Sequence, residues 1–173
     1  MESRQATFPF FVFGLTLFAM SDYDFVSVWN INAPLEKVWE TIKRSEAWPQ
    51  WWKGVIRVVE IKEGDADGLG SVRRSTWKSR LPYILEFDSE VIRIEPMKVI
   101  EARAFGELEG NGLWQFQATG DSLTRVQYDW SVKTTKQWMN LLAPIARPFF
   151  KWNHNVIMGW GEEGLRKKLK QMA

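Results

Sequence analysis

The side chains best suited to chemistry are three isolated polar groups, Tyr128, Asn153 and His154, which stand among apolar neighbours. At helical spacing, Asn153 lies near the middle of a broad apolar face and His154 lies on its flank. A buried amide needs hydrogen-bond partners, which a ligand, a water molecule or a strand backbone can supply. His154 is the single histidine and could act as a general base on a substrate held beside it. The alternative interpretation is structural, with Asn153 bonded to a strand backbone and His154 a satisfied flank residue that packs beside the short helices.

The composition argues against several other kinds of site. The chain has no cysteine, which rules out disulfides and thiol chemistry, and with one histidine a zinc site would need carboxylates for nearly all its ligands. We therefore expect no metal and no cofactor. The 23 basic and 21 acidic side chains give a net charge of +2, which attracts a phosphate backbone only weakly. Nucleic acid is not an expected partner.

Alternation of apolar and polar side chains predicts about seven strands separated by turn residues. The first covers residues 23–31, and the six others cover residues 55–63, 71–79, 83–94, 99–105, 114–118 and 126–132. The glycines of residues 106–112 resemble those of a phosphate loop, but this segment connects two strands and opens no helix. We therefore expect a hairpin there, with its turn at Gly110-Asn111-Gly112.

Helices are predicted on both sides of this run of strands. Pro34 suits the start of a short amphipathic helix over residues 35–42, and a second short turn follows before the tryptophan-rich corner at residues 48–52. After residue 135 the composition is helical again. Pro144 and Pro148 divide it into a piece near residues 136–142 and a long helix from about Arg147, with a kink at its entry.

The order of these elements defines the expected architecture. Consecutive strands joined by short turns form an antiparallel sheet, and the last helix is the only element long enough to cover its face. The sequence therefore predicts an α+β helix-grip fold, in which a curved antiparallel sheet of about seven strands wraps around a long C-terminal helix and two short helices follow the first strand.

This order of elements accompanies two local motifs, INAPLEKVW at residues 31–39 and WPQWW at residues 48–52. Together they resemble the Bet v 1-like, START-related (SRPBCC) superfamily, and within it the polyketide cyclase/dehydrase-like branch of small bacterial proteins. The resemblance covers about Asp22 to Leu169. It implies a ligand cavity under the long helix. Because members include lipid and hormone carriers as well as aromatase/cyclases, the fold alone does not select an activity.

We expect an apolar cavity between the sheet and the long helix. Large rings alternate along neighbouring strands and point inward together, while Ala102, Ala104 and Ala118 share that face and leave room beside them. Arg103 would enter the cavity only if the strand phase were shifted by one residue. The predicted ligand-binding residues are Trp77, Phe87, Trp114, Phe116, Tyr128, Trp130, Asn153, His154, Ile157 and Trp160.

The predicted function is the binding of a hydrophobic or aromatic small molecule, such as a lipid, an isoprenoid or a polyketide. A first alternative is a cyclase- or dehydratase-type enzyme, in which Tyr128, Asn153 and His154 orient and polarise such a molecule. A second alternative is a protein-interaction module with a filled core. We expect binding rather than catalysis and assign no catalytic residue. An open cavity would favour the first two hypotheses, and a closed core would favour the third.

The first 20 residues are set apart from the ligand-binding domain predicted over residues 21–173. Residues 8–19 form an almost uninterrupted apolar run, which is too short to span a bilayer and lacks the positive start of a signal peptide. We interpret residues 1–20 as an extension that is disordered or lies upstream of a natural start at Met20. We expect a cytoplasmic protein without a stable membrane span, the alternative being export or membrane association through residues 1–19.

Overall fold

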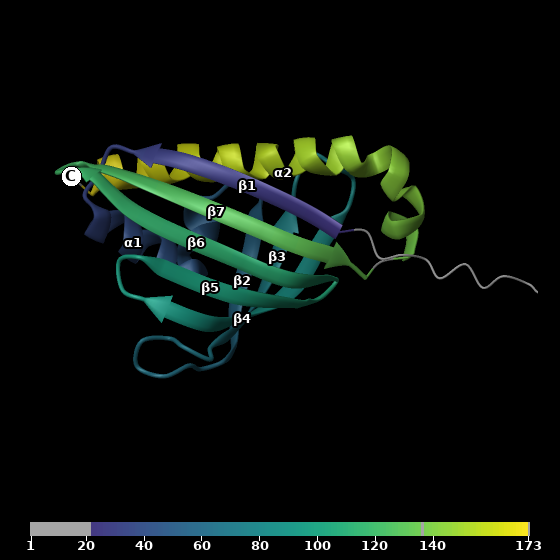
Figure 1. Ribbon diagram of the computed structural model, residues 1–173, viewed down its shortest axis with the longest axis horizontal. Coiled ribbons are helices and arrows are strands. Elements are labelled where there is room, and N and C mark those ends of the chain that lie inside the picture. The colour runs from purple at the N-terminus through teal and green to yellow at the C-terminus, as the bar shows by residue number, and fades with distance from the viewer. Residues whose placement is uncertain (1–21, 136, 173) are drawn as a thin grey trace, which may run out of the picture.

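The computed structural model describes residues 22–135 and 137–172, with the side chains of residues 23–135 and 148–172. Seven strands form one antiparallel sheet in the order β1-β7-β6-β5-β4-β3-β2. They are β1 (Asp22–Ile31), β2 (Val55–Lys62), β3 (Val72–Lys78), β4 (Ile84–Glu95), β5 (Val99–Gly106), β6 (Leu108–Gly120) and β7 (Leu123–Thr134). The sheet curves around the C-terminal helix α2 (Gln137–Gln171), as Figure 1 shows. The predicted helix-grip fold is confirmed.

The first strand lies beside the last one. β1 pairs with β7 over its whole length, from Asp22 opposite Lys133 to Ile31 opposite Thr124. Along β1 the burial alternates, with Trp29 2% exposed and Val26 65% exposed. One face of β1 therefore joins the core under α2, as the sequence pattern predicts.

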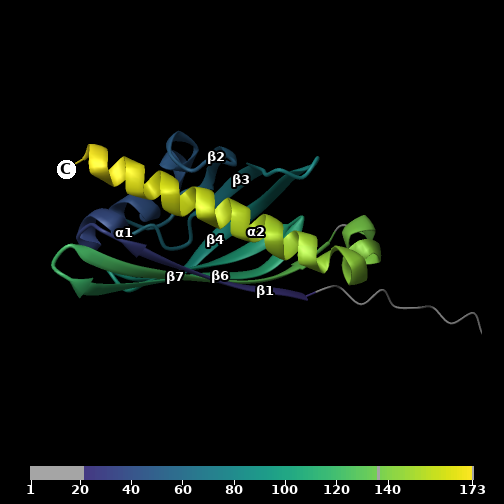
Figure 2. The same cartoon turned by 90° about the horizontal axis from the view of Figure 1, so that it is seen from above.

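The two short helices close one end of the molecule. Helix α1 (Leu35–Lys43) buries Val38, Trp39 and Ile42, the residues that recur at helical spacing, and the 3₁₀ helix η1 (Ser45–Gln50) follows it. Figure 2 shows α1 beneath the C-terminal part of α2. The Lys37 ammonium donates to the Met172 carbonyl across this junction, at 3.3 Å.

The tryptophan-rich corner after η1 anchors α2 against the sheet. Trp52 is 1% exposed, and its indole N–H donates to the Ile157 carbonyl at 2.8 Å. Its ring contacts those of Trp29, Trp77 and Trp114 at centroid distances of 5.3, 5.4 and 6.1 Å. Gly161 of α2 allows this contact, because a Cβ there would lie 2.4 Å from Trp52 Cε2. The core is thus built around aromatic rings.

Helix α2 corrects one prediction. A separate piece near residues 136–142 and a long helix from about Arg147 were expected, but α2 is one element from Gln137 to Gln171. Its N-terminal part nevertheless bends sharply away from the long axis (Figures 1 and 2). Pro144 and Pro148 lie toward this end of the helix. Proline lacks an N–H and clashes with the preceding turn, so it bends a helix. The two prolines therefore bend α2 here without interrupting it.

The turn predicted at Gly110-Asn111-Gly112 is wrong. These residues lie within β6, and the chain reverses at Glu107, after Gly106 with φ of 106°. The glycines serve close approach instead, since a Cβ on Gly110 would lie 2.1 Å from the Ser131 carbonyl oxygen. Glycines that predict a turn from the sequence are needed here because the neighbouring strand approaches β6 closely.

Among residues 22–135 and 137–172, no helix is long and apolar enough to cross a membrane. The extension predicted over residues 1–20 lies outside the described residues.

Candidate functional site

A partly open pocket of about 200 Å³ lies between α2 and the concave face of the sheet. Its walls come from β1, η1 and the following corner, strands β3 to β7, and α2. Eight of the ten predicted ligand-binding residues line it: Trp77, Phe87, Trp114, Tyr128, Trp130, Asn153, His154 and Ile157. The structure therefore brings most of the predicted set together around one space, while their contact with a ligand stays a prediction.

One wall of the pocket is a row of aromatic rings. Trp114 and Tyr128 are register partners on β6 and β7, and their rings stack at 4.1 Å with 24° between their planes. Tyr128 and Trp130 follow at 5.8 Å and 22°. Because residues two apart on a strand share a face, the two strands place these rings in one face-to-face stack that borders the pocket.

Gly112 makes room for the centre of this wall. It pairs with Trp130 on one side and with Ala102 on the other. A Cβ at Gly112 would lie 2.5 Å from the Tyr128 hydroxyl oxygen and 2.8 Å from Trp130 Cε3. The missing side chain thus lets the Tyr128 hydroxyl lie against the strand backbone at the pocket.

The Tyr128 hydroxyl is a hydrogen-bond donor rather than a base. Burial raises the pKa of Tyr128 far above its ordinary value, so the phenol stays protonated at any physiological pH. A polar group that enters the pocket could accept a hydrogen bond from this hydroxyl.

Asn153 projects from α2 into the pocket lining, as predicted. Its Oδ1 atom is buried and accepts no hydrogen bond from any described residue, and the Trp77 Nε1 atom on β3 is buried and equally unpaired. The structural interpretation, in which Asn153 bonds a strand backbone, is therefore not what the described residues show. Since buried polar groups are normally satisfied, these two atoms mark places for polar groups of a ligand or for water.

His154 lines the pocket beside β1 and is held by two contacts. Its ring stacks on Phe25 at 4.3 Å with 13° between the planes, and its Nε2 atom lies 3.3 Å from Ser27 Oγ. Burial lowers the pKa of His154 to about 4, so the imidazole is neutral near pH 7. A neutral ring can exchange hydrogen bonds with a ligand but is a weak base.

Of the residues whose side chains the structure describes, no Lys, Arg, Asp or Glu lines the pocket. Arg103 points away from it and pairs with Glu90 at 2.6 Å on the outer face, so the predicted strand phase is correct. Among the described residues, no group of three or more His, Asp or Glu side chains could hold a metal ion. The site thus offers aromatic surface and a few neutral polar atoms.

Phe116 and Trp160, the two other predicted ligand-binding residues, lie outside the pocket lining. Phe116 packs edge-on against Trp39 of α1 at 5.0 Å. Trp160 lies under the Lys53 ammonium, which is 4.6 Å from the ring centroid. Ala102 lines the pocket and Ala104 is buried, but Ala118, expected on the same face, is exposed at the far end of β6.

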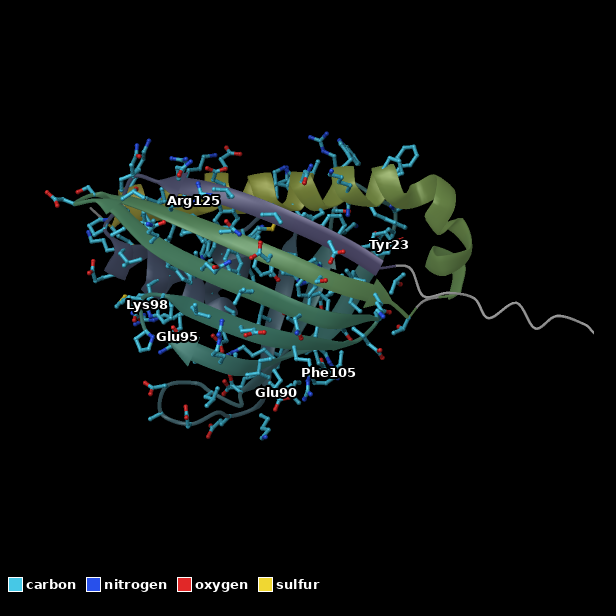
Figure 3. All side chains as sticks on the ribbon, in the orientation of Figure 1. Tyr23, Glu90, Glu95, Lys98, Phe105 and Arg125 are labelled. Carbon is cyan, nitrogen blue, oxygen red and sulfur yellow. The ribbon has the colours of Figure 1, made fainter. Side chains whose placement is uncertain are left out.

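Several lining residues were not predicted. Tyr23 and Phe25 come from β1, and Phe150 from α2 packs against Tyr23 at 5.6 Å, at the end where α2 bends (Figure 3). Trp48 and Trp52 come from the corner, and Tyr83 precedes β4. The alternation of Tyr23 and Phe25 along β1 was the available signal, because an inward-facing ring on the strand beside β7 must reach the same space.

An antiparallel sheet closed over an apolar pocket by a C-terminal helix defines the START-related, Bet v 1-like class of helix-grip proteins. The chain belongs to the polyketide cyclase/dehydrase and lipid transport family, whose model matches residues 31–156. The resemblance predicted from the motifs at residues 31–39 and 48–52 is thereby confirmed. No curated protein sequence matches the chain.

Solved structures share the fold at low sequence identity. The Zhui aromatase/cyclase from Streptomyces sp. R1128 is 14% identical with a TM-score of 0.71, covering 87% of this chain and 95% of its own. A START superfamily protein from Mycobacterium smegmatis is 16% identical with a TM-score of 0.72, and the match covers 87% of this chain and 99% of the other. A point mutant of norcoclaurine synthase from Thalictrum flavum is 11% identical with a TM-score of 0.59, and the match covers 88% of this chain and 98% of the other. At these identities the likenesses establish the fold and not the activity.

Proposed function

We propose that the protein binds a hydrophobic small molecule in the pocket between α2 and the sheet. The observation that carries the proposal is an unfilled space of about 200 Å³ in the middle of an aromatic core. Protein interiors are normally packed to the density of organic crystals, so a space of this size bounded by rings favours an occupant.

The polar atoms of the pocket support the same function. Asn153 Oδ1 and Trp77 Nε1 are buried without partners among the described residues. An unpaired buried polar atom costs about 1–3 kcal/mol, which a ligand carrying matching groups would remove. A protein-interaction module with a filled core would need neither the space nor the unpaired atoms.

Substitution of a pocket alanine tests this function. In Ala102→Leu the added side chain occupies the pocket, whereas Ala118→Leu makes the same change at an exposed position on the neighbouring strand. Native mass spectrometry of the purified protein, followed by thermal-shift titration with a panel of lipids, isoprenoids and aromatic compounds, measures binding. We expect Ala102→Leu to abolish the retained mass and the shifts, and Ala118→Leu to keep both. Equal behaviour of wild type and Ala102→Leu would contradict binding in this pocket.

A cyclase or dehydratase acting on the same kind of molecule is a second proposal. It is favoured by the family and by the presence of Tyr128, Asn153 and His154 around one pocket. The aromatase/cyclases and norcoclaurine synthase among the similar structures suggest candidate reactions. Any such turnover should fall at least tenfold in His154→Ala and Tyr128→Phe, and turnover that survives both changes would remove the roles named for these residues.

A further inference from the structure

The size of the pocket limits its ligand. Sites for drug-sized molecules usually enclose about 300–1,000 Å³, whereas an engineered apolar cavity of about 150 Å³ holds a single benzene ring. A pocket of about 200 Å³ therefore suits one ring or two fused rings rather than a long acyl chain or a four-ring skeleton.

The shape of the pocket favours a planar molecule. The rings of Trp114, Tyr128 and Trp130 are within 24° of parallel from one neighbour to the next. Because these rings already cover one another's faces, a planar aromatic ligand can set its own face against the edges of the row, in the edge-to-face arrangement that aromatic rings also prefer. Phe87, tilted by 40° to Trp130, closes the end of the row.

The polar atoms of the pocket have complementary hydrogen-bonding roles. Asn153 Oδ1 is an acceptor on α2, while Trp77 Nε1 is a donor on β3, and both are buried without partners among the described residues. The protonated Tyr128 hydroxyl adds a donor on the aromatic wall. A ligand hydroxyl that reaches one of these atoms can donate to the first or accept from the others, whereas a pure hydrocarbon leaves all of them unpaired.

The electrostatics of the pocket disfavour an ion. Among the side chains that the structure describes, no Lys, Arg, Asp or Glu lines it, and the neutral His154 supplies no charge near pH 7. The cations Lys53 and Arg80 lie over the Trp160 ring, which is outside the lining. An ionised ligand would therefore enter an apolar space without a counter-ion.

From these four features we infer that the pocket selects an uncharged planar molecule of one or two fused rings that carries a hydroxyl or an equivalent neutral polar group. The inference rests on the proposed function and narrows it, because it excludes long lipids, large polycyclic skeletons and free carboxylates from this space.

Four probes, three of matched shape and one larger, test the inference at pH 7 by calorimetric titration. 2-Naphthol has the inferred features, naphthalene lacks the hydroxyl, 2-naphthoate carries a negative charge, and 1-hydroxypyrene is too large. We expect 2-naphthol to bind about tenfold more tightly than naphthalene, the difference that one neutral hydrogen bond makes. We expect 2-naphthoate and 1-hydroxypyrene to bind at least a hundredfold more weakly than 2-naphthol or not at all.

A pair of variants on α2 locates the polar selection. Asn153→Leu removes the unpaired oxygen from the pocket, whereas Asn155→Leu makes the same change at an exposed position two residues away. We expect Asn153→Leu to reduce the difference between 2-naphthol and naphthalene, because only the Trp77 and Tyr128 donors remain, and Asn155→Leu to keep the tenfold difference. Thermal melting of both variants verifies that they are folded. If a variant does not fold, the wild-type probe series still tests the inference.

The outcomes separate this inference from the function on which it rests. Equal affinity of wild type for 2-naphthol and naphthalene overturns the polar selection, tight binding of 2-naphthoate overturns the charge selection, and tight binding of 1-hydroxypyrene overturns the size limit. If no probe binds while long lipids do, the inference fails and the proposed function stands. If neither the probes nor the lipid and aromatic panel bind, the proposed function fails.

Discussion

The Tyr128 hydroxyl oxygen occupies the space that a side chain at Gly112 would need, with only 2.5 Å between that oxygen and the position of a Cβ. Both residues lie on the wall of the pocket, on the neighbouring strands β6 and β7. The backbone of one strand therefore determines where the polar atom of the next strand points.

Gly112→Ala should consequently damage the pocket more than the fold. The added methyl group must displace Tyr128 or Trp130, and such overpacking costs about 1–3 kcal/mol of stability. We expect the affinity for the pocket ligand to fall about tenfold, because the displaced rings no longer keep the stack that borders the pocket. Calorimetric titration beside urea unfolding measures the two effects. Unchanged affinity would show that Gly112 does not position Tyr128 for binding.

The fold could be predicted from the sequence because its signals are local. Alternation gave the strands, helical spacing gave α1, and the short turns required antiparallel pairing. The same alternation gave the phase of β6 and β7, which is why Trp114, Tyr128 and Trp130 were predicted on the inward face and lie there.

The rest of the site depends on contacts between distant segments. Phe116 shares the inward face of Trp114, but α1 covers that end of the sheet and takes Phe116 into its own packing with Trp39. The alternation of side chains along a strand shows which face of the sheet a residue occupies, but it does not show how far along the strand the pocket extends. The contribution of Phe25 required knowing that the first strand pairs with the last, which no local pattern encodes.

Two glycines of α2 should respond in opposite directions to alanine. A Cβ on Gly161 would lie 2.4 Å from Trp52 Cε2, whereas one on Gly159 would meet nothing within 4 Å. We expect Gly161→Ala to destabilise the protein by about 1–3 kcal/mol through displacement of Trp52. Gly159→Ala should stabilise it by about 0.5–1 kcal/mol, the ordinary helical preference for alanine. Urea unfolding measures both, and equal shifts would mean that α2 does not approach Trp52 closely.

Thr124 ties β7 to the segment between β1 and α1. Its hydroxyl is fully buried and donates to the Ala33 carbonyl at 2.8 Å. Thr124→Val keeps the shape but leaves that carbonyl unpaired, so we expect a loss of about 1–3 kcal/mol. Thr119→Val is the control, because Thr119 is exposed and donates to Leu123 O at the surface, and it should change stability by less than about 0.5 kcal/mol. A similar effect of both substitutions on the urea midpoint would count against the buried bond.

His154 should make the stability of the protein depend on pH below neutrality. Burial lowers its pKa from the ordinary 6.5 to about 4, with no charged group as a cause. Between these two values the unfolded chain binds a proton that the native state does not bind, so the free energy of unfolding decreases as the pH falls from about 6.5 to about 4. The full stability is present above pH 6.5.

The loss is at most about 3 kcal/mol, since each unit of pKa shift corresponds to about 1.4 kcal/mol and the ring is partly accessible. His154→Gln keeps a polar group near Ser27 without a titrating ring, so it should lack this component. Carboxylates titrate over part of the same range in both proteins, which makes the difference between wild type and variant the informative quantity. The free energies of unfolding come from urea unfolding at successive pH values. The value of the wild type minus that of His154→Gln should be constant above pH 6.5 and should decrease steadily below it. A constant difference from pH 7 to pH 4 would mean that His154 titrates normally, and that the imidazole beside Phe25 is accessible to water rather than enclosed by the pocket.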